Sequence, residues 1–556
     1  MRRRDFVRTT SLAAIGALLS PRLSSERPRA DLVLRGATVF DGTGAPGREL
    51  DVVVTGDRVS AVGRRLPAGG AELDLRGLAL APGFIDIHSH ADLALFIEPR
   101  AESRIRQGIT LEVVGQDGDS TGPWSEDAYQ ENRGRYRERY GVELDFRDPP
   151  GFLDAIDRVR PAVNVATMVG NGTVRELVVG TDDRPATDAE LGRMKDEVRR
   201  ALNGGCVGLS SGLEYAPSGF AGSAELGALA SVLRGSGYPY ASHMRNEDDR
   251  LLAAVEEAIL IGRLGGVPVE ISHLKAQGRR NYWKADAVLD LLAKARAGGV
   301  DVAFDVYPYT AYQTGLSNLF PTEHRAGGTD AFLERLRNPA TAGRLEAACR
   351  EKVALLGDWN AVQITSAGDS AAWAKGRRIG DLARERGADP YALVLELLEA
   401  SHGGAGMIGH GMSEEDVEKL IAHPLSAICT DGGAYAPYGP LAAGSPHPRG
   451  YGTFARLLGR YVRERGALAL ETAIHKCTGE PARRLRLEDR GRIAAGAYAD
   501  LVAFDPGAVL DRATFEDPHQ YATGIPLVMV NGVLTLREGE HTGALGGRAV
   551  RGDAVL

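Results

Sequence analysis

Four histidines and two aspartates each follow a short apolar segment of this 556-residue chain, and their types are those of a metal site. Neutral imidazoles and carboxylates are the ligands of zinc and of similar borderline metals. In an H-x-H pair on a strand, both side chains point to the same face, so they can bind one ion together. The six residues are His88 and His90 (GFIDIHSH), Asp117 (EVVGQD), His243 (YASH), His273 (VEISH) and Asp431 (SAICTD).

Each of these residues also has an ordinary structural explanation. His243 or His273 alone would more often be a hydrogen-bonded core histidine, and Asp431 in TDGG could begin a turn. The prediction of a metal therefore depends on the six residues together. Of the other histidines, only His410 directly follows a strand-like segment (GMIG), and we expect the rest to be structural or exposed.

The segments that carry these residues alternate with longer helical patterns over residues 77–485. CVGLSSG, DVAFDVYPY and AGMIGHG are typical apolar segments, and DAELGRMKDEVRRALNGG is a typical helical one. Repeated strand-then-helix units predict an α/β fold with a parallel sheet, and roughly eight units favour a TIM-like (β/α)₈ barrel. In such a barrel the functional side chains gather at the carboxyl ends of the strands. The region 316–399 is longer than one unit requires, which predicts an insertion.

Both ends of the remaining chain have a different, period-two pattern. DLVLRGATVFDGTG and DVVVTGDRVSAVG lie within residues 31–76, and ADLVAFDP and IPLVMVNGVLTLREGE lie within residues 486–556. Such alternation, interrupted by Gly and Asp turns, is typical of short strands. We therefore expect one β-sandwich domain that is formed from both chain ends.

Residues 1–30 have the features of an export signal. The sequence RRRDFVR precedes the apolar stretch SLAAIGALLS, which is too short to span a bilayer. RRDFVR resembles a twin-arginine signal, which a receptor reads and which is not an anchor. We therefore expect a periplasmic or extracellular protein with no stable membrane anchor beyond this segment; a disordered basic tail is the alternative.

The composition is that of a globular protein with more than one core. The chain is 43% hydrophobic and 25% charged, and its formal net charge is −8. This acidic balance argues against nucleic acid as the main partner and leaves a small-molecule substrate. The four cysteines form no CxxC pair, so we expect buried free thiols. The oligomeric state is left open.

Several motifs, in their order along the chain, resemble those of the amidohydrolase superfamily. They are APGFIDIHSHAD, SHLK, TDGG, HPRGYGTF and GRIAAGAYADLVAFDP. Within the superfamily the chain is most similar to the N-acyl-D-amino-acid deacylase (D-aminoacylase) family, over about residues 31–535. The resemblance implies a metal-dependent barrel that hydrolyses the amide of an N-acylated D-amino acid. It also implies that His243 and His273 hold a tightly bound Zn²⁺, and that His88 and His90 form the other half of the site.

Two positions depart from the family pattern. The family typically has a GNCG string whose cysteine binds the metal, whereas this chain has GQDG with Asp117 at that place. A carboxylate can still bind zinc or bridge two ions, but its hard oxygen favours Mn²⁺, Co²⁺ or a two-metal arrangement. Asn171 in VGNG stands where the relatives would have a histidine.

The resemblance also implies roles for the remaining site residues. Asp431 would take a proton from the attacking water and deliver it to the leaving amine. A substrate with a carboxylate and a developing oxyanion needs cations and hydroxyl donors. The candidate substrate contacts are Lys275, Arg449, Tyr215 and Tyr307.

Three other functions compete with this one. The closest is hydrolysis of a cyclic amide or a D-dipeptide on the same scaffold. A metal-free serine hydrolase built on Ser210 would use the G-x-S-x-G match at residues 208–212, although no helix follows it as that motif requires. The third is a catalytically idle metal-binding relative, which the replacement of cysteine by Asp117 suggests.

Overall fold

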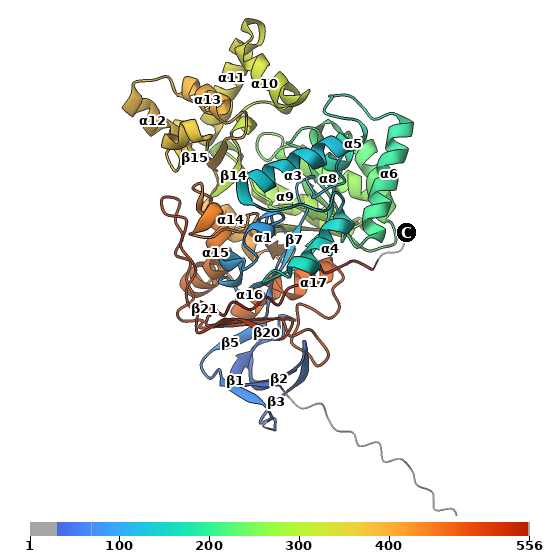
Figure 1. Cartoon of the computed structure of the whole chain (residues 1–556), viewed down its shortest axis with the longest axis vertical. Coiled ribbons are helices and arrows are strands. Elements are labelled where there is room, and N and C mark those ends of the chain that lie inside the picture. The colour runs from blue at the N-terminus through green and yellow to red at the C-terminus, as the bar shows by residue number, and fades with distance from the viewer. Residues whose placement is uncertain (1–30, 68, 554–556) are drawn as a thin grey trace, which may run out of the picture.

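The computed structural model describes residues 31–67 and 69–553, so the predicted signal segment lies outside the described residues. The two ends of this range pair in one nine-stranded mixed sheet, at the bottom of Figure 1. Strand β5 (Ala79–Pro82) runs antiparallel to β18 (Leu501–Phe504) and joins the two ends. The other strands are β1 (Leu32–Val39), β2 (Arg48–Thr55), β3 (Arg58–Gly63), β4 (Ala71–Asp74), β19 (Leu527–Val530), β20 (Val533–Arg537) and β21 (Glu540–His541).

This mixed sheet has an apolar core of its own. Its strands bury alternate Leu and Val side chains, which is the pattern that the period-two sequence predicts. Leu34 and Val52 come from the first end of the chain and Leu501 from the second, and all three are fully buried. The two ends therefore form one β unit with a shared core.

Parallel strands carry the predicted site residues. They form a three-stranded sheet in the order β6-β7-β8 and a six-stranded sheet in the order β17-β13-β12-β11-β10-β9. Met168 alone separates β8 from β9, so the chain passes directly from the three-stranded sheet into the six-stranded sheet. The strands are β6 (Phe84–Asp86), β7 (Ile109–Val114), β8 (Asn164–Thr167), β9 (Val169–Gly170), β10 (Leu209–Gly212), β11 (Tyr240–His243), β12 (Val269–Ile271), β13 (Val302–Val306) and β17 (Ser426–Ile428).

Helices follow most of these strands, as the alternating sequence pattern predicts. In α6, Thr187 and Glu190 form a capping box that fixes the first turn. Helices between consecutive parallel strands include α4 (Pro149–Val159), α5 (Asn171–Val178), α6 (Asp188–Asn203), α7 (Ser223–Ala230), α8 (Leu251–Gly265) and α9 (Lys284–Ala297), and α14 (Glu414–Ala422) precedes β17. The four cysteines are buried and free, as predicted. Among the described residues, no helix is long and apolar enough to cross a membrane.

A separate antiparallel sheet lies between β13 and β17, where the sequence predicts extra length. Its strands are β14 (Ala311–Gly315), β15 (Val362–Ser366) and β16 (Gly406–His410), in the order β14-β16-β15. The expectation that AGMIGHG belongs to the parallel strands is therefore wrong. An apolar strand pattern shows that a segment is buried but does not identify its neighbours, and β16 pairs antiparallel with both β14 and β15.

Candidate active site

The carboxylate of Asp117 lies at the centre of the four predicted histidines. Its Oδ1 is 3.3 Å from both His88 Nε2 and His273 Nε2. Its Oδ2 is 3.4 Å from His90 Nε2 and 3.5 Å from His243 Nδ1. Each oxygen therefore faces one histidine from each half of the predicted site. The five residues come from the ends of four strands, β6, β7, β11 and β12, and meet because these parallel strands end at the same edge.

The donor atoms fit a metal ion. Both ring nitrogens of His88, Oδ1 of Asp117 and Nε2 of His243 are buried and have no hydrogen-bond partner among the described residues. Buried polar atoms are normally satisfied, so such a set indicates a binding site. Among the described residues, three groups of potential ligands have donor atoms within 4.8 Å of one another, and Asp117 belongs to two of them. The groups are His88, His90, Asp117 and Asp431; Asp117, His243 and His273; and Glu214, His243 and Glu247.

The electrostatics of the site also favour a cation. Burial by itself lowers the pKa of His243, but the charges of Asp117 and Glu247 outweigh it and raise this pKa to about 10. Burial also disfavours the protonation of His90. Hydrogen bonds and charge from Asp117 and Asp431 outweigh it, so the pKa of His90 lies well above its ordinary value. The negative electrostatic potential that keeps these imidazoles protonated also attracts a divalent cation to the same place.

Three site residues have left-handed backbone conformations that side chains rarely adopt. The φ angles are 55° at Asp117, 36° at His273 and 50° at Asp431. Such conformations persist only where the surrounding structure enforces them, and they concentrate at functional sites. Gly115, at φ 72°, lets the chain turn sharply after β7, because a Cβ there would lie 2.3 Å from the carbonyl oxygen of Met168.

The G-x-S-x-G segment supports this turn and supplies no nucleophile. Ser210 is fully buried; its hydroxyl donates to the carbonyl of Gly115 at 2.6 Å and accepts from the amide of Gly118 at 3.1 Å. Gly212 is required by packing, because a Cβ there would lie 1.9 Å from the carbonyl oxygen of Asp117. A serine hydrolase built on Ser210 therefore has no support in the geometry.

Asp431 is held at the site from two directions. Its backbone amide donates to the carbonyl of His88 at 2.9 Å, and its Oδ1 is 3.2 Å from His90 Nε2. Asp86 of β6 accepts from the Thr430 amide at 2.8 Å and from its hydroxyl at 2.5 Å, which fixes the residue before Asp431. Although burial raises the pKa of Asp431, Arg449 and then His273 hold it well below its ordinary value. Asp431 is therefore an ionised acceptor beside the metal ligands.

Arg449 lies where the sequence predicts a substrate contact. Its Nη1 is 2.6 Å from Asp431 Oδ2, and its guanidinium carbon lies 4.8 Å from the centre of the Tyr307 ring. Tyr307 is 1% exposed, and its hydroxyl has no hydrogen-bond partner among the described residues. Tyr215 lines the cavity, and its hydroxyl is 3.2 Å from the Thr314 hydroxyl.

Lys275 is held by a carboxylate that sequence reasoning missed. Its Nζ lies 2.6 Å from Glu247 Oε1 and 2.7 Å from His273 Nδ1, and Gln277 donates to the other oxygen of Glu247 at 2.8 Å. The spacing SHMRNE places Glu247 four residues after His243, and this offset from a strand-end histidine was the available signal. Glu214 was also missed; its Oε2 lies 3.5 Å from His243 Nε2.

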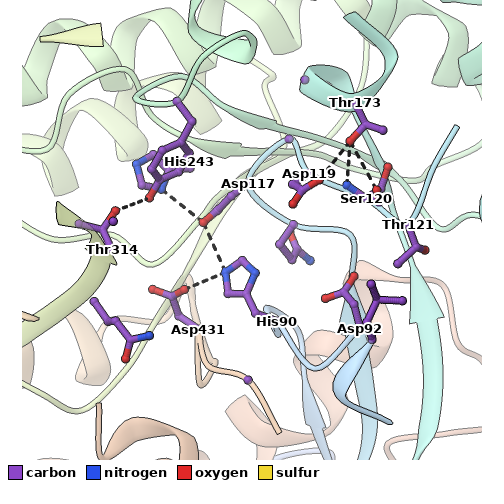
Figure 2. Close-up of a pocket in the computed structure, with 18 of the residues that line it drawn as sticks. His90, Asp92, Asp117, Asp119, Ser120, Thr121, Thr173, His243, Thr314 and Asp431 are labelled. Atoms are coloured by element: carbon purple, nitrogen blue, oxygen red, sulfur yellow. Dashed lines mark hydrogen bonds and ion pairs between the residues drawn. The ribbon is translucent and has the colours of Figure 1, made fainter. Parts of the chain in front are cut away.

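The site opens into a cavity of about 960 Å³. Figure 2 shows Asp117 between His243 and His90, with Asp431 beside His90 on the same side as Thr314. Helix α3 (Glu126–Tyr140) contributes to the cavity wall and buries none of its residues completely. Asn171, the second departure from the family, lies outside the cavity wall and accepts from the Ser218 hydroxyl at 2.5 Å.

Comparisons with known proteins agree with this geometry. The model of the amidohydrolase family matches residues 71–536. The chain is 36% identical to the D-aminoacylase of Alcaligenes xylosoxydans, covering 94% of this chain and 97% of that protein. It is also 36% identical to the N-acyl-D-aspartate deacylase of the same species, covering 93% and 94%.

A solved structure extends the likeness to three dimensions. The N-acyl-D-glutamate deacylase of Bordetella bronchiseptica, complexed with zinc and a phosphonate mimic of the tetrahedral intermediate, aligns with a TM-score of 0.79. The two are 33% identical, and the alignment covers 94% of this chain and all of that one. With its metal-ligand geometry and near full-length matches, the chain belongs to the amidohydrolase family.

Proposed function

We propose that this protein hydrolyses the amide bond of N-acyl-D-amino acids and releases a carboxylate and a D-amino acid. The observation that carries the proposal is the Asp117 carboxylate, which four imidazoles surround at 3.3–3.5 Å beside Asp431 and Arg449. Near full-length relatives named D-aminoacylase and N-acyl-D-aspartate deacylase support this choice of substrate.

The metal is Zn²⁺ in one or two copies, with Mn²⁺ or Co²⁺ as alternatives that the oxygen of Asp117 favours. His243 and His273 would hold one ion with Asp117, and His88 and His90 would hold a second. A bound metal of this kind lowers the pKa of water toward neutrality and polarises a carbonyl group. Zinc in the Bordetella deacylase supports the same assignment.

Asp431 is the proton carrier in this proposal. Its ionised carboxylate accepts the proton of the attacking water and then donates it to the amide nitrogen, which leaves poorly as an anion. Its neighbours keep it in place, because Asp86 fixes Thr430 and Arg104 donates to the carbonyl of Gly432 and, at 3.1 Å, to the Thr430 hydroxyl.

Arg449 and Lys275 provide positive charge for the substrate α-carboxylate. Arg449 is 3% exposed, so its charge acts in a region of low dielectric and with a fixed orientation. Tyr215, which lines the cavity, provides a hydroxyl donor to the carboxylate or to the oxyanion. Tyr307, the other predicted contact, is buried outside the cavity wall and packs against the guanidinium of Arg449, so it orients that side chain. Lys275 would share its ammonium between the substrate and Glu247.

The finer architecture follows the same proposal. The parallel strands β6 to β13 and β17, with β8 and β9 counted as one strand interrupted at Met168, close into a (β/α)₈ barrel over residues 83–485. The Asp431–His88 backbone contact supports closure between β17 and β6. The β-sandwich comprises residues 31–82 and 486–556, because β5 pairs with β1 and β18 and so moves the predicted boundary at residue 76, and an insertion lies near 316–399. Residues 1–30 direct export by a twin-arginine-type route to the periplasm or the exterior.

A substrate panel tests the reaction class. Purified protein loaded with Zn²⁺ is assayed on N-acetyl-D-amino acids and on two cyclic amides, hydantoin and dihydrouracil. We expect turnover of the acyclic compounds only, and its loss after chelation. Turnover confined to the cyclic amides would replace the proposal with the cyclic-amide alternative, and turnover that survives chelation would contradict a metal-dependent reaction.

A further inference from the structure

His447, in the HPRGYG motif, takes no part in the proposed reaction but directly contacts the segment that carries Arg449. It is 1% exposed and lies outside the cavity wall, so it does not touch the substrate. Arg449, two residues later, lines the cavity and is the first residue of α15 (Arg449–Arg456). The contacts of His447 therefore bear on how Arg449 is held.

Both ring nitrogens of His447 have backbone partners, and these partners fix its protonation state. Nδ1 accepts a hydrogen bond from the Arg449 amide at 3.0 Å, so this nitrogen carries no proton. Nε2 lies 2.9 Å from the carbonyl oxygen of Ala311, which can only accept, so Nε2 carries the hydrogen. Burial and then the charge of Arg449 hold the pKa of His447 well below its ordinary value, which agrees with a neutral ring.

The bond to Nδ1 lies where a helix begins and its amides lack partners. The first amides of an α-helix have no acceptor within the helix itself. Pro448, which precedes α15, provides no side-chain cap, and His447 binds the Arg449 amide instead. Because this amide and the guanidinium belong to one residue, the bond limits where the guanidinium can lie.

His447 also connects Arg449 to β14, the first strand of the antiparallel sheet. Its own amide donates to Gln313 Oε1 at 2.7 Å, in addition to the bond between its ring and Ala311. The carbonyl oxygen of Gln313 lies 3.4 Å from Nη2 of Arg449, and both residues line the cavity. Three hydrogen bonds of His447 thus hold two adjoining parts of the cavity wall together.

Aromatic rings from two other segments pack against the His447 ring. Phe515, between β18 and β19, has its ring centre 4.9 Å from that of His447, at an angle of 80°. Its carbonyl accepts from Gln363 of β15 at 2.8 Å. Tyr309, which follows β13, lies at 5.1 Å and 89°. These edge-to-face contacts favour the ring orientation that the three hydrogen bonds require.

We propose that His447 is a positioning residue that holds Arg449 in place for the α-carboxylate of the substrate. The role of Arg449 comes from the proposed function, on which this inference rests. A guanidinium binds a carboxylate best through two parallel hydrogen bonds, so its orientation matters as well as its charge. Through His447, Phe515 of the C-terminal region contributes to substrate binding from outside the cavity.

Two substitutions at position 447 separate the roles of the two ring nitrogens. Asparagine readily accepts from the amide two residues later, so His447→Asn keeps the bond to Arg449. Glutamine is longer by one carbon and replaces Nε2 instead, so His447→Gln keeps the bond to Ala311 and loses the bond to Arg449.

Steady-state kinetics on N-acetyl-D-leucine with the zinc-loaded protein give the readout. We expect His447→Gln to raise KM at least about 10-fold, because a displaced guanidinium binds the carboxylate less well. Its kcat should stay within about 3-fold of the wild type, since the backbone of Asp431 is bound independently to His88. His447→Asn should keep KM within about 3-fold of the wild type.

Two further variants exclude a general loss of structure. Phe515→Leu leaves the hydrogen bonds of His447 in place but removes the edge-to-face contact, so KM should rise about 3-fold. His410→Gln is the matched control and should leave KM unchanged. The His410 ring packs against the same Phe515 at 4.7 Å, but its side-chain hydrogen bond goes to Gln363 and not to the Arg449 segment. Metal content should equal that of the wild type in every variant.

Specific outcomes would overturn the inference. An unchanged KM in His447→Gln at full metal content would reject it and leave the proposed function intact. Equal rises of KM in His447→Gln and His447→Asn would also reject it, because they would indicate a packing role for the ring. If His447→Gln does not fold, an unchanged KM in Phe515→Leu rejects it. If the wild type hydrolyses no N-acyl-D-amino acid, the proposed function fails and this inference fails with it.

Discussion

At the scale of single residues, Asp117 has unusual surroundings for a carboxylate. It stands where the relatives would have a cysteine, yet its two oxygens face all four imidazoles. A carboxylate offers two donor atoms where a thiolate offers one, so it suits a bridging position between two ions. The replacement therefore argues for a working site and against an idle relative.

Removing this carboxylate should weaken metal binding. We expect Asp117→Ala to lower metal affinity by more than about 100-fold, because even an outer partner of a ligand contributes about 10–100-fold. Metal content after dialysis, measured by elemental analysis, checks this result. Asp117→Cys is the matched control and should retain metal; equal metal content in wild type and Asp117→Ala would show that Asp117 is no ligand.

Replacing Asp431 should separate catalysis from metal binding. Asp431→Asn keeps the size of the side chain but removes the proton acceptor, so we expect kcat to fall by about 10²–10⁴-fold. The ion held by His243, His273 and Asp117 should remain, so we expect at least one metal ion per chain, even though Asp431 also belongs to the group of potential ligands with His88 and His90. Activity within a few fold of the wild type would assign the proton transfer to another group.

Residue type and strand-end position were enough to find the six central residues, because parallel strands bring their carboxyl ends together. They did not reveal Glu247, Glu214 or Asp86. The one local signal was the four-residue offset of Glu247 from His243. The contacts that give these residues their roles are with residues of other strands, and no local pattern records such a contact. Asp86 lies two residues before His88 in the sequence, but only the structure shows that its carboxylate accepts a hydrogen bond from Thr430.

At the scale of elements, the antiparallel sheet between β13 and β17 has a pH-sensitive residue. Burial, assisted by the charge of Arg378, lowers the pKa of His410 to about 4. Its Nε2 lies 3.1 Å from Gln363 Oε1, so β16 and β15 are linked by the neutral ring. The unfolded chain binds the proton more readily, with an ordinary pKa of about 6.5.

This shift predicts a loss of stability in acid. The contribution of neutral His410 is complete above about pH 6.5 and is lost as the pH falls from there toward 4. Between pH 7 and 5 the wild type should therefore lose about 1–2 kcal/mol more than His410→Gln, which cannot be protonated. Urea unfolding at the two pH values measures the difference; identical losses would show that His410 is protonated in the folded protein as well.

The order of the elements was only partly predictable from the sequence. Alternating strands and helices identified the parallel strands, and the extra length identified the insertion. The assignment of Gly406–His410 failed because its apolar pattern is the same in a parallel and in an antiparallel sheet. Which strands pair with one another depends on the whole chain. β16 pairs with β15 and β14, which begin about 50 and 100 residues earlier.

At the scale of the whole molecule, a buried polar network joins the mixed sheet to the parallel strands. Asp500, just before β18, forms an ion pair with Arg490 and accepts from the Asn531 amide at 2.7 Å. The Asn531 side chain donates to Asn164, the first residue of β8, at 2.7 Å. The C-terminal part of the mixed sheet is thus connected directly to β8, one of the parallel strands.

Breaking this network should destabilise the entire protein. We expect Asp500→Ala to cost about 3–5 kcal/mol, because it leaves the buried guanidinium of Arg490 without its partner. Asp489→Ala breaks an exposed pair with Arg58 and should cost less than about 1 kcal/mol. Chemical unfolding of both variants makes the comparison, and equal losses would contradict the structural role of Asp500.

The central claim is a metal-dependent reaction that selects the D configuration, and paired enantiomers test it most directly. The measurement is kcat/KM for N-acetyl-D- and N-acetyl-L-amino acids with the zinc-loaded protein, before and after chelation. We predict hydrolysis of the D compounds at least about 100-fold faster than their L partners, a difference of about 2.7 kcal/mol, with loss on chelation and recovery on adding Zn²⁺. Equal rates on both enantiomers, or hydrolysis of neither, would contradict the claim.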